Sequence, residues 1–163
     1  MKRNNLNHLV DIAVDATKLA RNLVSGGGGA FRDLEERQGR EWKIVADRQV
    51  EQVLINHLQE NSVLPILSEE RGQLEGKGEL KWVLDPLDGS ANFHRGIPFN
   101  CISIGLWEQS DPVAGVILDL QREELFTGII GEGAWCNERK IRVNTLQNPD
   151  HAVLCTGFPA AFR

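Results

Sequence analysis

Two aspartates three residues apart, Asp85 and Asp88, form the pattern in this sequence that most clearly suggests chemistry. They stand in the run Asp-Pro-Leu-Asp-Gly-Ser, directly after an apolar segment. Pro86 and Gly89 favour a fixed turn, so the two carboxylates can converge. Converging carboxylates favour a hard divalent cation such as Mg²⁺, to which the backbone carbonyl of Leu87 could add a ligand.

The residues after the second aspartate could bind an anion. If the chain turns into a short helix here, the N–H groups of Gly89, Ser90 and Ala91 point at one spot. An anion site beside a metal site suits the chemistry of phosphate esters. The alternative reading of the residues alone is that Asp85 and Asp88 only cap a turn, as Asp-Pro and Asp-Gly pairs often do.

The surrounding sequence predicts two helices followed by a series of strands. Apolar residues recur at three- and four-residue steps over about residues 5–24, and again over about 47–58, where Glu51 is expected to lie away from the apolar stripe. Eight short runs are apolar or alternate in polarity, which is typical of strands. They cover residues 63–67, 80–84, 99–107, 113–120, 124–130, 134–136, 141–143 and 152–156. This order predicts an α+β fold, with helices packed on a largely antiparallel sheet, in one domain over residues 1–163.

The composition argues against a nucleic-acid-binding, a disulfide-rich or a membrane-spanning protein. The 163 residues include 18 Lys plus Arg and 23 Asp plus Glu, a net charge of −5, so no broad basic face for nucleic acid is expected. Three widely spaced cysteines, Cys101, Cys136 and Cys155, fit reduced thiols in a cytoplasmic protein better than a disulfide framework. No stretch of about 18 apolar residues occurs, so we expect neither a membrane span nor a signal peptide.

The segment that holds the two aspartates resembles the DP-hydrophobic-DG-Thr/Ser motif of the inositol monophosphatase family, which are Mg²⁺-dependent, lithium-sensitive phosphatases. Three further segments are similar to family motifs in the same order. Residues 44–47 resemble a Thr-x-x-Asp segment, residues 67–70 a Glu-Glu segment, and residues 131–137 a Gly-x-Gly-Ala-x-x-Asn turn. The likeness runs from about residue 6 to the last residue and corresponds to the N-terminal, catalytic half of the family fold.

The resemblance implies a Mg²⁺ site. Its ligands would be the side chains of Glu69, Asp85 and Asp88 and the carbonyl of Leu87. Glu70 could bind the metal in place of Glu69, because adjacent residues of a strand face opposite sides and the sequence does not fix which side. The family motif favours Glu69.

The resemblance also implies roles in catalysis and substrate binding. Ser90, paired with Asp47, would orient a metal-activated water together with Glu69, while the amides of Gly89, Ser90 and Ala91 hold the phosphate. Asp47 has a second reading as the N-cap of the second helix. The reaction implied is hydrolysis of a small phosphorylated substrate, with inositol monophosphate expected first.

Two rival functions remain open. A 3′(2′),5′-bisphosphate nucleotidase or a sugar bisphosphatase would share these motifs. A non-enzymatic remnant that binds metal or phosphate is the other rival, because the family's second half supplies a further metal ligand from a Trp-Asp motif. If the 163 residues are the whole polypeptide, we expect weak or absent activity. The family also leads us to expect a homodimer.

Overall fold

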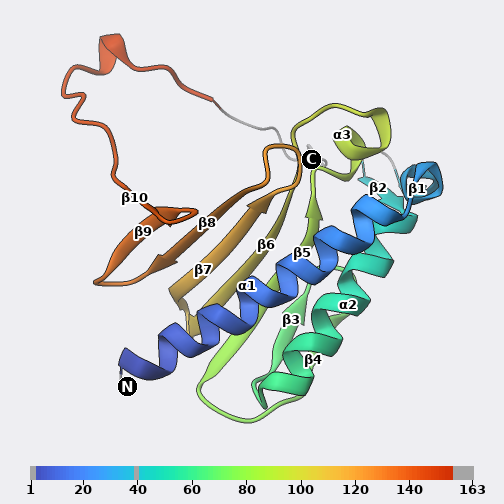
Figure 1. Ribbon diagram of the computed structural model, residues 1–163, viewed down its shortest axis with the longest axis horizontal. Coiled ribbons are helices and arrows are strands. Elements are labelled where there is room, and N and C mark those ends of the chain that lie inside the picture. The colour runs from blue at the N-terminus through green and yellow to red at the C-terminus, as the bar shows by residue number, and fades with distance from the viewer. Residues whose placement is uncertain (1–2, 39–40, 156–163) are drawn as a thin grey trace.

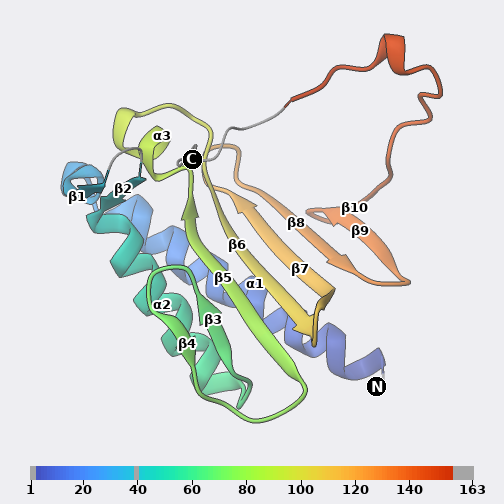
Figure 2. The ribbon, with the colours of Figure 1, turned by 180° about the vertical axis from the view of Figure 1, so that it is seen from behind.

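The structure is a computed structural model, and it describes residues 3–38 and 41–155. Two long helices, α1 (Arg3–Gly26) and α2 (Val45–Asn61), lie side by side across one face of a sheet (Figure 1). Seen from behind, the strands stand in front of both helices, so the other face is open in the described part of the chain (Figure 2). Among the described residues, no helix combines the length and the apolar character that crossing a bilayer requires.

Within residues 3–38 and 41–155, this sheet has eight strands in the order β10-β9-β8-β7-β6-β5-β3-β4. Their bounds are β3 Ile66–Ser68, β4 Gly72–Leu74, β5 Leu80–Asp88, β6 Cys101–Glu108, β7 Asp111–Asp119, β8 Glu124–Ile129, β9 Gly133–Cys136 and β10 Arg139–Ile141. All neighbouring pairs of this sheet are antiparallel except β3 and β5, which run parallel. The prediction of an α+β fold with a largely antiparallel sheet is therefore confirmed.

The core lies between the helices and the sheet. Alternate residues of the central strands point to this side, as the burial of Ile102, Ile104 and Leu106 on β6 shows. Small residues of α1, such as Ala16 and Ala20, are fully buried and let the two helices approach closely. Burial of this apolar surface is the main force that holds α1 and α2 on the sheet.

The predicted strand at residues 152–156 is wrong over the part that the structure describes. Ala152–Cys155 belong to no strand, and the side chains of Val153 and Leu154 are 97% and 91% exposed. Residue 156 lies outside the described residues. The run from Arg142 leaves the sheet, with one short 3₁₀ helix, η2 (Pro149–His151) (Figure 1). An alternating apolar pattern forms a strand only where another strand offers a free edge, and here the chain runs away from the sheet.

The sequence analysis also missed a hairpin and a short strand. Strands β1 (Leu34–Gln38) and β2 (Glu41–Ile44) pair as a separate two-stranded sheet between α1 and α2, after a 3₁₀ helix, η1 (Gly29–Arg32). The missed short strand is β4, with three residues. Neither β1 nor β4 has the apolar alternation that marks a half-buried strand, so no periodicity could reveal them.

Candidate active site

The end of β5 and the start of α3 (Ser90–Arg95) form a tight corner. Asp85 is still in register with Ser103 of β6, and the ladder becomes irregular between Asp85 and Asp88. Gly89 then adopts a left-handed conformation with a φ of 89°, and a Cβ atom on it would lie 2.7 Å from the carbonyl oxygen of Phe99. Only glycine fits this conformation and this space without strain. The expected short helix after Gly89 is therefore confirmed.

Glu69 reaches the same corner from the neighbouring strand. Ser68, the last residue of β3, is in parallel register with Leu84, and the N–H of Glu69 donates to the carbonyl of Leu84 at 3.2 Å. The ends of two parallel strands thus place Glu69 next to Asp85, and their carboxyl groups share a hydrogen bond. Glu70 turns to the other side, where it pairs with Lys43 at 2.5 Å. Of the two glutamates, Glu69 is the one that meets the aspartates.

Asp85 lies in an electrostatically unfavourable place for a lone carboxylate. Its Oδ1 atom is buried and has no hydrogen-bond partner among the described residues. Burial, together with the negative charges of Glu69 and Asp88, raises the pKa of Asp85 to about 7. An unpartnered buried oxygen among three carboxylates is a setting that a bound cation would stabilise.

The predicted metal ligands lie near one another but are not arranged as a coordination site. In the part of the chain that the structure describes, no three His, Cys, Asp or Glu side chains are arranged to hold a metal ion. Asp88 is exposed, with its Oδ2 atom 3.9 Å from the Cys101 thiol. The assignment of Glu69, Asp85, Asp88 and the Leu87 carbonyl as ligands stays a prediction.

Asp47 and Ser90 meet as expected. The hydroxyl of Ser90 lies 2.8 Å from Oδ1 of Asp47 and 2.9 Å from the carbonyl of Leu87. Burial raises the pKa of Asp47 to about 6, although hydrogen bonds from the Ile44 N–H and the Ser90 hydroxyl oppose the shift. This pair joins α2 to the corner at the end of β5.

The N-cap reading of Asp47 needs correction. α2 begins at Val45 with Ile44 as the N-cap, so Asp47 is the third helical residue. Its Oδ2 atom accepts the N–H of Ile44 at 2.8 Å. This is one of the two hydrogen bonds of a capping box, the one from the N-cap N–H to the side chain of the third helical residue. The other hydrogen bond is not formed, because the apolar side chain of Ile44 has no acceptor. Asp47 therefore stabilises the helix start with one oxygen and holds Ser90 with the other.

The amides expected to bind phosphate lie beside Asp88. Gly89 is the N-cap of α3, and its carbonyl accepts the N–H of Phe93 at 2.9 Å. The N–H groups of the first helical turn, including those of Ser90 and Ala91, have no acceptor within the helix. Binding of a phosphate by these N–H groups stays a prediction.

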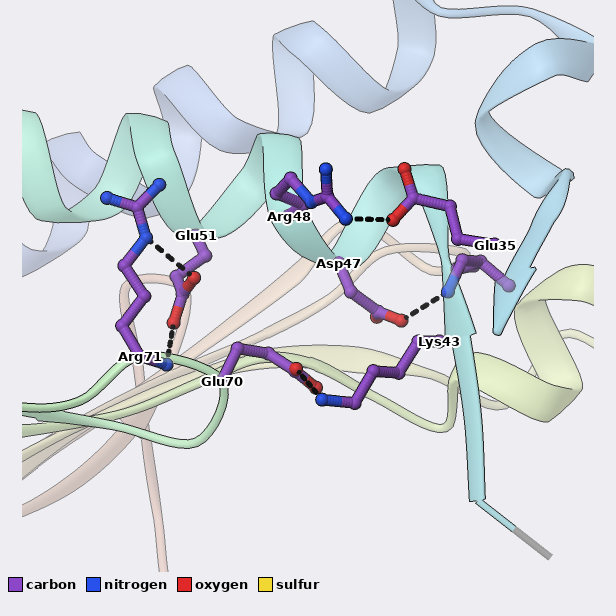
Figure 3. Close-up of a pocket in the computed structure, with 8 residues that line it drawn as sticks. Glu35, Lys43, Asp47, Arg48, Glu51, Glu70 and Arg71 are labelled. Carbon is purple, nitrogen blue, oxygen red and sulfur yellow. Dashed lines mark hydrogen bonds and ion pairs between the residues drawn. The ribbon is translucent and has the colours of Figure 1, made fainter. Parts of the chain in front are cut away.

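A charged pocket of about 280 Å³ lies behind the corner, on the helix side of the sheet (Figure 3). Three ion pairs cross or border it: Lys43–Glu70, Arg48–Glu35 at 2.8 Å, and Arg71–Glu51 at 3.1 Å. Glu51 is only 1% exposed, so its expected place away from the apolar stripe is wrong. The hydrophobic pattern of α2 could not predict that Glu51 is buried, because its hydrogen-bond partners Ser68 and Arg71 lie far away in the sequence.

Comparisons with known proteins agree with this geometry. The model of the inositol monophosphatase family matches residues 5–161. The chain is 34% identical over 158 residues to the Nus factor SuhB of Pasteurella multocida, covering 94% of this chain and 59% of that protein. It is 36% identical over 153 residues to the inositol-1-monophosphatase of Synechocystis sp., covering 91% and 53%.

A solved structure has the same fold. The extragenic suppressor protein suhB from Bartonella henselae superposes with a TM-score of 0.78 at 31% identity, over 85% of this chain and 54% of that one. The chain therefore spans less than two thirds of the length of each of these relatives. Since the family match covers almost all of its residues, the chain belongs to the inositol monophosphatase family.

Proposed function

We propose that this chain hydrolyses a phosphate monoester with Mg²⁺, and that inositol monophosphate is the substrate. Family membership and the relative named inositol-1-monophosphatase support phosphatase chemistry. The observation that carries the proposal is the buried Oδ1 atom of Asp85, which accepts no hydrogen bond from any described residue and has Glu69 and Asp88 beside it. Such a group favours a cation where the end of β5 meets the first amides of α3.

The donors present fit Mg²⁺. Glu69, Asp85, Asp88 and the Leu87 carbonyl would hold the ion, and all four are the oxygen ligands that this hard cation prefers. When bound, Mg²⁺ supplies positive charge that stabilises the transferring phosphoryl group and makes water a better nucleophile. The same charge would lower the pKa of Asp85 from its raised value.

The chain's own side chains would orient the reaction. Because the Ser90 hydroxyl can donate its proton to Oδ1 of Asp47, its lone pairs remain free to accept a hydrogen bond from the attacking water. The carboxyl of Glu69 offers a second acceptor across the corner. The amides of Gly89, Ser90 and Ala91 would bind the phosphoryl oxygens, so that water and phosphorus are held in line.

The test is phosphate release from inositol monophosphate, with Mg²⁺ and with EDTA. We expect release that requires Mg²⁺ and is lost in Asp85→Asn, while the exposed control Asp111→Asn keeps it. Faster release from a 3′,5′-bisphosphate nucleotide or a sugar bisphosphate would support those rival substrates. Release that is indifferent to both Mg²⁺ and Asp85 would contradict the proposal.

A second candidate is a protein that binds Mg²⁺ or phosphate without completing a turnover. What favours it is that the relative from Pasteurella multocida is named a Nus factor and not a phosphatase. Calorimetry separates the two functions. Binding of Mg²⁺ or inorganic phosphate with no release of product would support the second candidate and contradict hydrolysis by this chain.

A further inference from the structure

The turn between β3 and β4 holds Glu69 at an exposed position. It runs from Ser68, the last residue of β3, to Gly72, the first residue of β4. The N–H of Glu69 donates to the carbonyl of Leu84 at 3.2 Å, which ties the backbone of the turn to β5. Because the Glu69 side chain is exposed, its direction depends on how firmly the turn itself is held.

Glu51 of α2 holds this turn from the helix side. Its carboxylate accepts hydrogen bonds from the Ser68 hydroxyl at 2.5 Å and from the backbone N–H of Arg71 at 3.0 Å. The second oxygen pairs with Nε of Arg71 at 3.1 Å (Figure 3). Ser68 precedes Glu69 and Arg71 follows Glu70, so one buried carboxylate fixes both ends of the turn.

A carboxylate at the buried position of Glu51 calls for a physical reason. Burial of a carboxylate is unfavourable unless donors surround it, and an apolar side chain on this face of α2 would pack without that cost. Asp47 stands one helical turn earlier and binds Ser90. α2 therefore reaches both parts of the proposed site, the corner through Asp47 and the turn through Glu51.

We propose that Glu51 is a positioning residue for the Mg²⁺ site: by fixing the β3–β4 turn, it directs the carboxyl of Glu69 towards Asp85. This inference rests on the proposed function, but it concerns the affinity of the chain for the metal rather than turnover. Loss of a group that orients a metal ligand commonly lowers metal affinity by roughly 10- to 100-fold.

Titration of the chain with Mg²⁺ by calorimetry tests this role. Glu51→Gln keeps the size of the side chain and removes the charge that pairs with Arg71, and we expect Mg²⁺ affinity to fall roughly tenfold or more. Glu60→Gln, at an exposed position near the end of the same helix, is the matched control and should bind as the wild type does. A folded Glu51→Gln variant with unchanged Mg²⁺ affinity would overturn the inference.

A second pair of variants covers the case in which Glu51→Gln does not fold. Ser68→Ala removes one donor to Glu51, and circular dichroism should show a folded protein whose Mg²⁺ affinity is several-fold weaker. Ile55→Val trims the core on α2 without touching the turn. If Ser68→Ala binds Mg²⁺ normally, or if Ile55→Val weakens binding as much, the positioning role is refuted. A wild-type chain that binds no Mg²⁺ would refute both this role and the proposed function.

Discussion

The Oδ1 atom of Asp85 is buried without a hydrogen-bond partner among the described residues, and burial with the charges of Glu69 and Asp88 raises its pKa to about 7. The ordinary value is 3.8. The folded protein therefore holds this proton more tightly than the unfolded chain does. The stability that this group contributes is fully present below about pH 4 and is lost as the pH rises towards 7.

Asp85→Asn should accordingly stabilise the metal-free protein at alkaline pH. We expect the free energy of unfolding at pH 8 in EDTA to rise on the order of 1 kcal/mol, a figure that allows for solvent screening of a partly buried group. Below pH 4 the two proteins should differ little. Urea unfolding at both pH values measures this, and a variant that is less stable than the wild type at pH 8 would argue against the raised pKa.

Substitution of Ser90 should mainly lower the rate of phosphate release, and substitution of Asp88 should mainly lower Mg²⁺ affinity. Ser90→Ala removes the hydrogen bond to Asp47, which costs about 1 kcal/mol of stability, and should slow phosphate release on the order of a hundredfold because water is no longer oriented. Its Mg²⁺ affinity should change little. Asp88→Asn should instead weaken Mg²⁺ binding, since an exposed ligand loses its charge. Equal activity of both variants and the wild type would count against these roles.

At the scale of elements, the corner between β5 and α3 depends on one backbone conformation. Gly89→Ala would place a Cβ 2.7 Å from the carbonyl of Phe99 at a φ of 89°. We expect a loss of roughly 1–3 kcal/mol in the free energy of unfolding, together with weaker Mg²⁺ binding. Gly26→Ala, at the end of α1 with open space around it, is the control and should be near neutral. Equal unfolding curves for the two variants would show that the corner tolerates a side chain.

The elements that could be predicted from the sequence are those with a local signal. The periodicity of apolar residues marks α1 and α2, and the Asp-Pro-Leu-Asp-Gly run marks the end of β5 with its turn. The contact between Ser90 and Asp47 followed only from the family resemblance, because 43 positions separate the two residues. Glu51 was misplaced, since its partners Ser68 and Arg71 lie in a distant turn. The strand expected at residues 152–156 is wrong over the described residues 152–155 for the opposite reason. The apolar pattern is present, but no neighbouring strand pairs with it among the described residues.

At the scale of the whole molecule, no helix of the described residues covers the second face of the sheet (Figure 2). Alternation along the strands turns Leu67 and Ile117 to this side, and both are partly exposed, at 37% and 43%. Phe99, beside the corner, is 67% exposed. Phe99 and Ile117 line one pocket, and exposed apolar groups of this kind favour association with other protein surfaces.

The chain should therefore self-associate, with a homodimer as the expected species. Sedimentation velocity should show a concentration-dependent species near twice the monomer mass of 18.2 kDa. Ile117→Lys, on the open face, should shift the distribution towards monomer, while Lys18→Ala, at an exposed position of α1, should not. A single monomeric species at every concentration would contradict the expected dimer.

The central claim is that Glu69, Asp85 and Asp88 share a divalent cation at the ends of β3 and β5. Crystals of the chain soaked in Mn²⁺, which takes the same oxygen ligands as Mg²⁺, allow the ion to be located by its anomalous scattering. We predict a peak within about 2–2.5 Å of carboxylate oxygens from at least two of these residues and of the Leu87 carbonyl. A fully occupied Mn²⁺ elsewhere, with Glu69 turned away from Asp85, would contradict the claim.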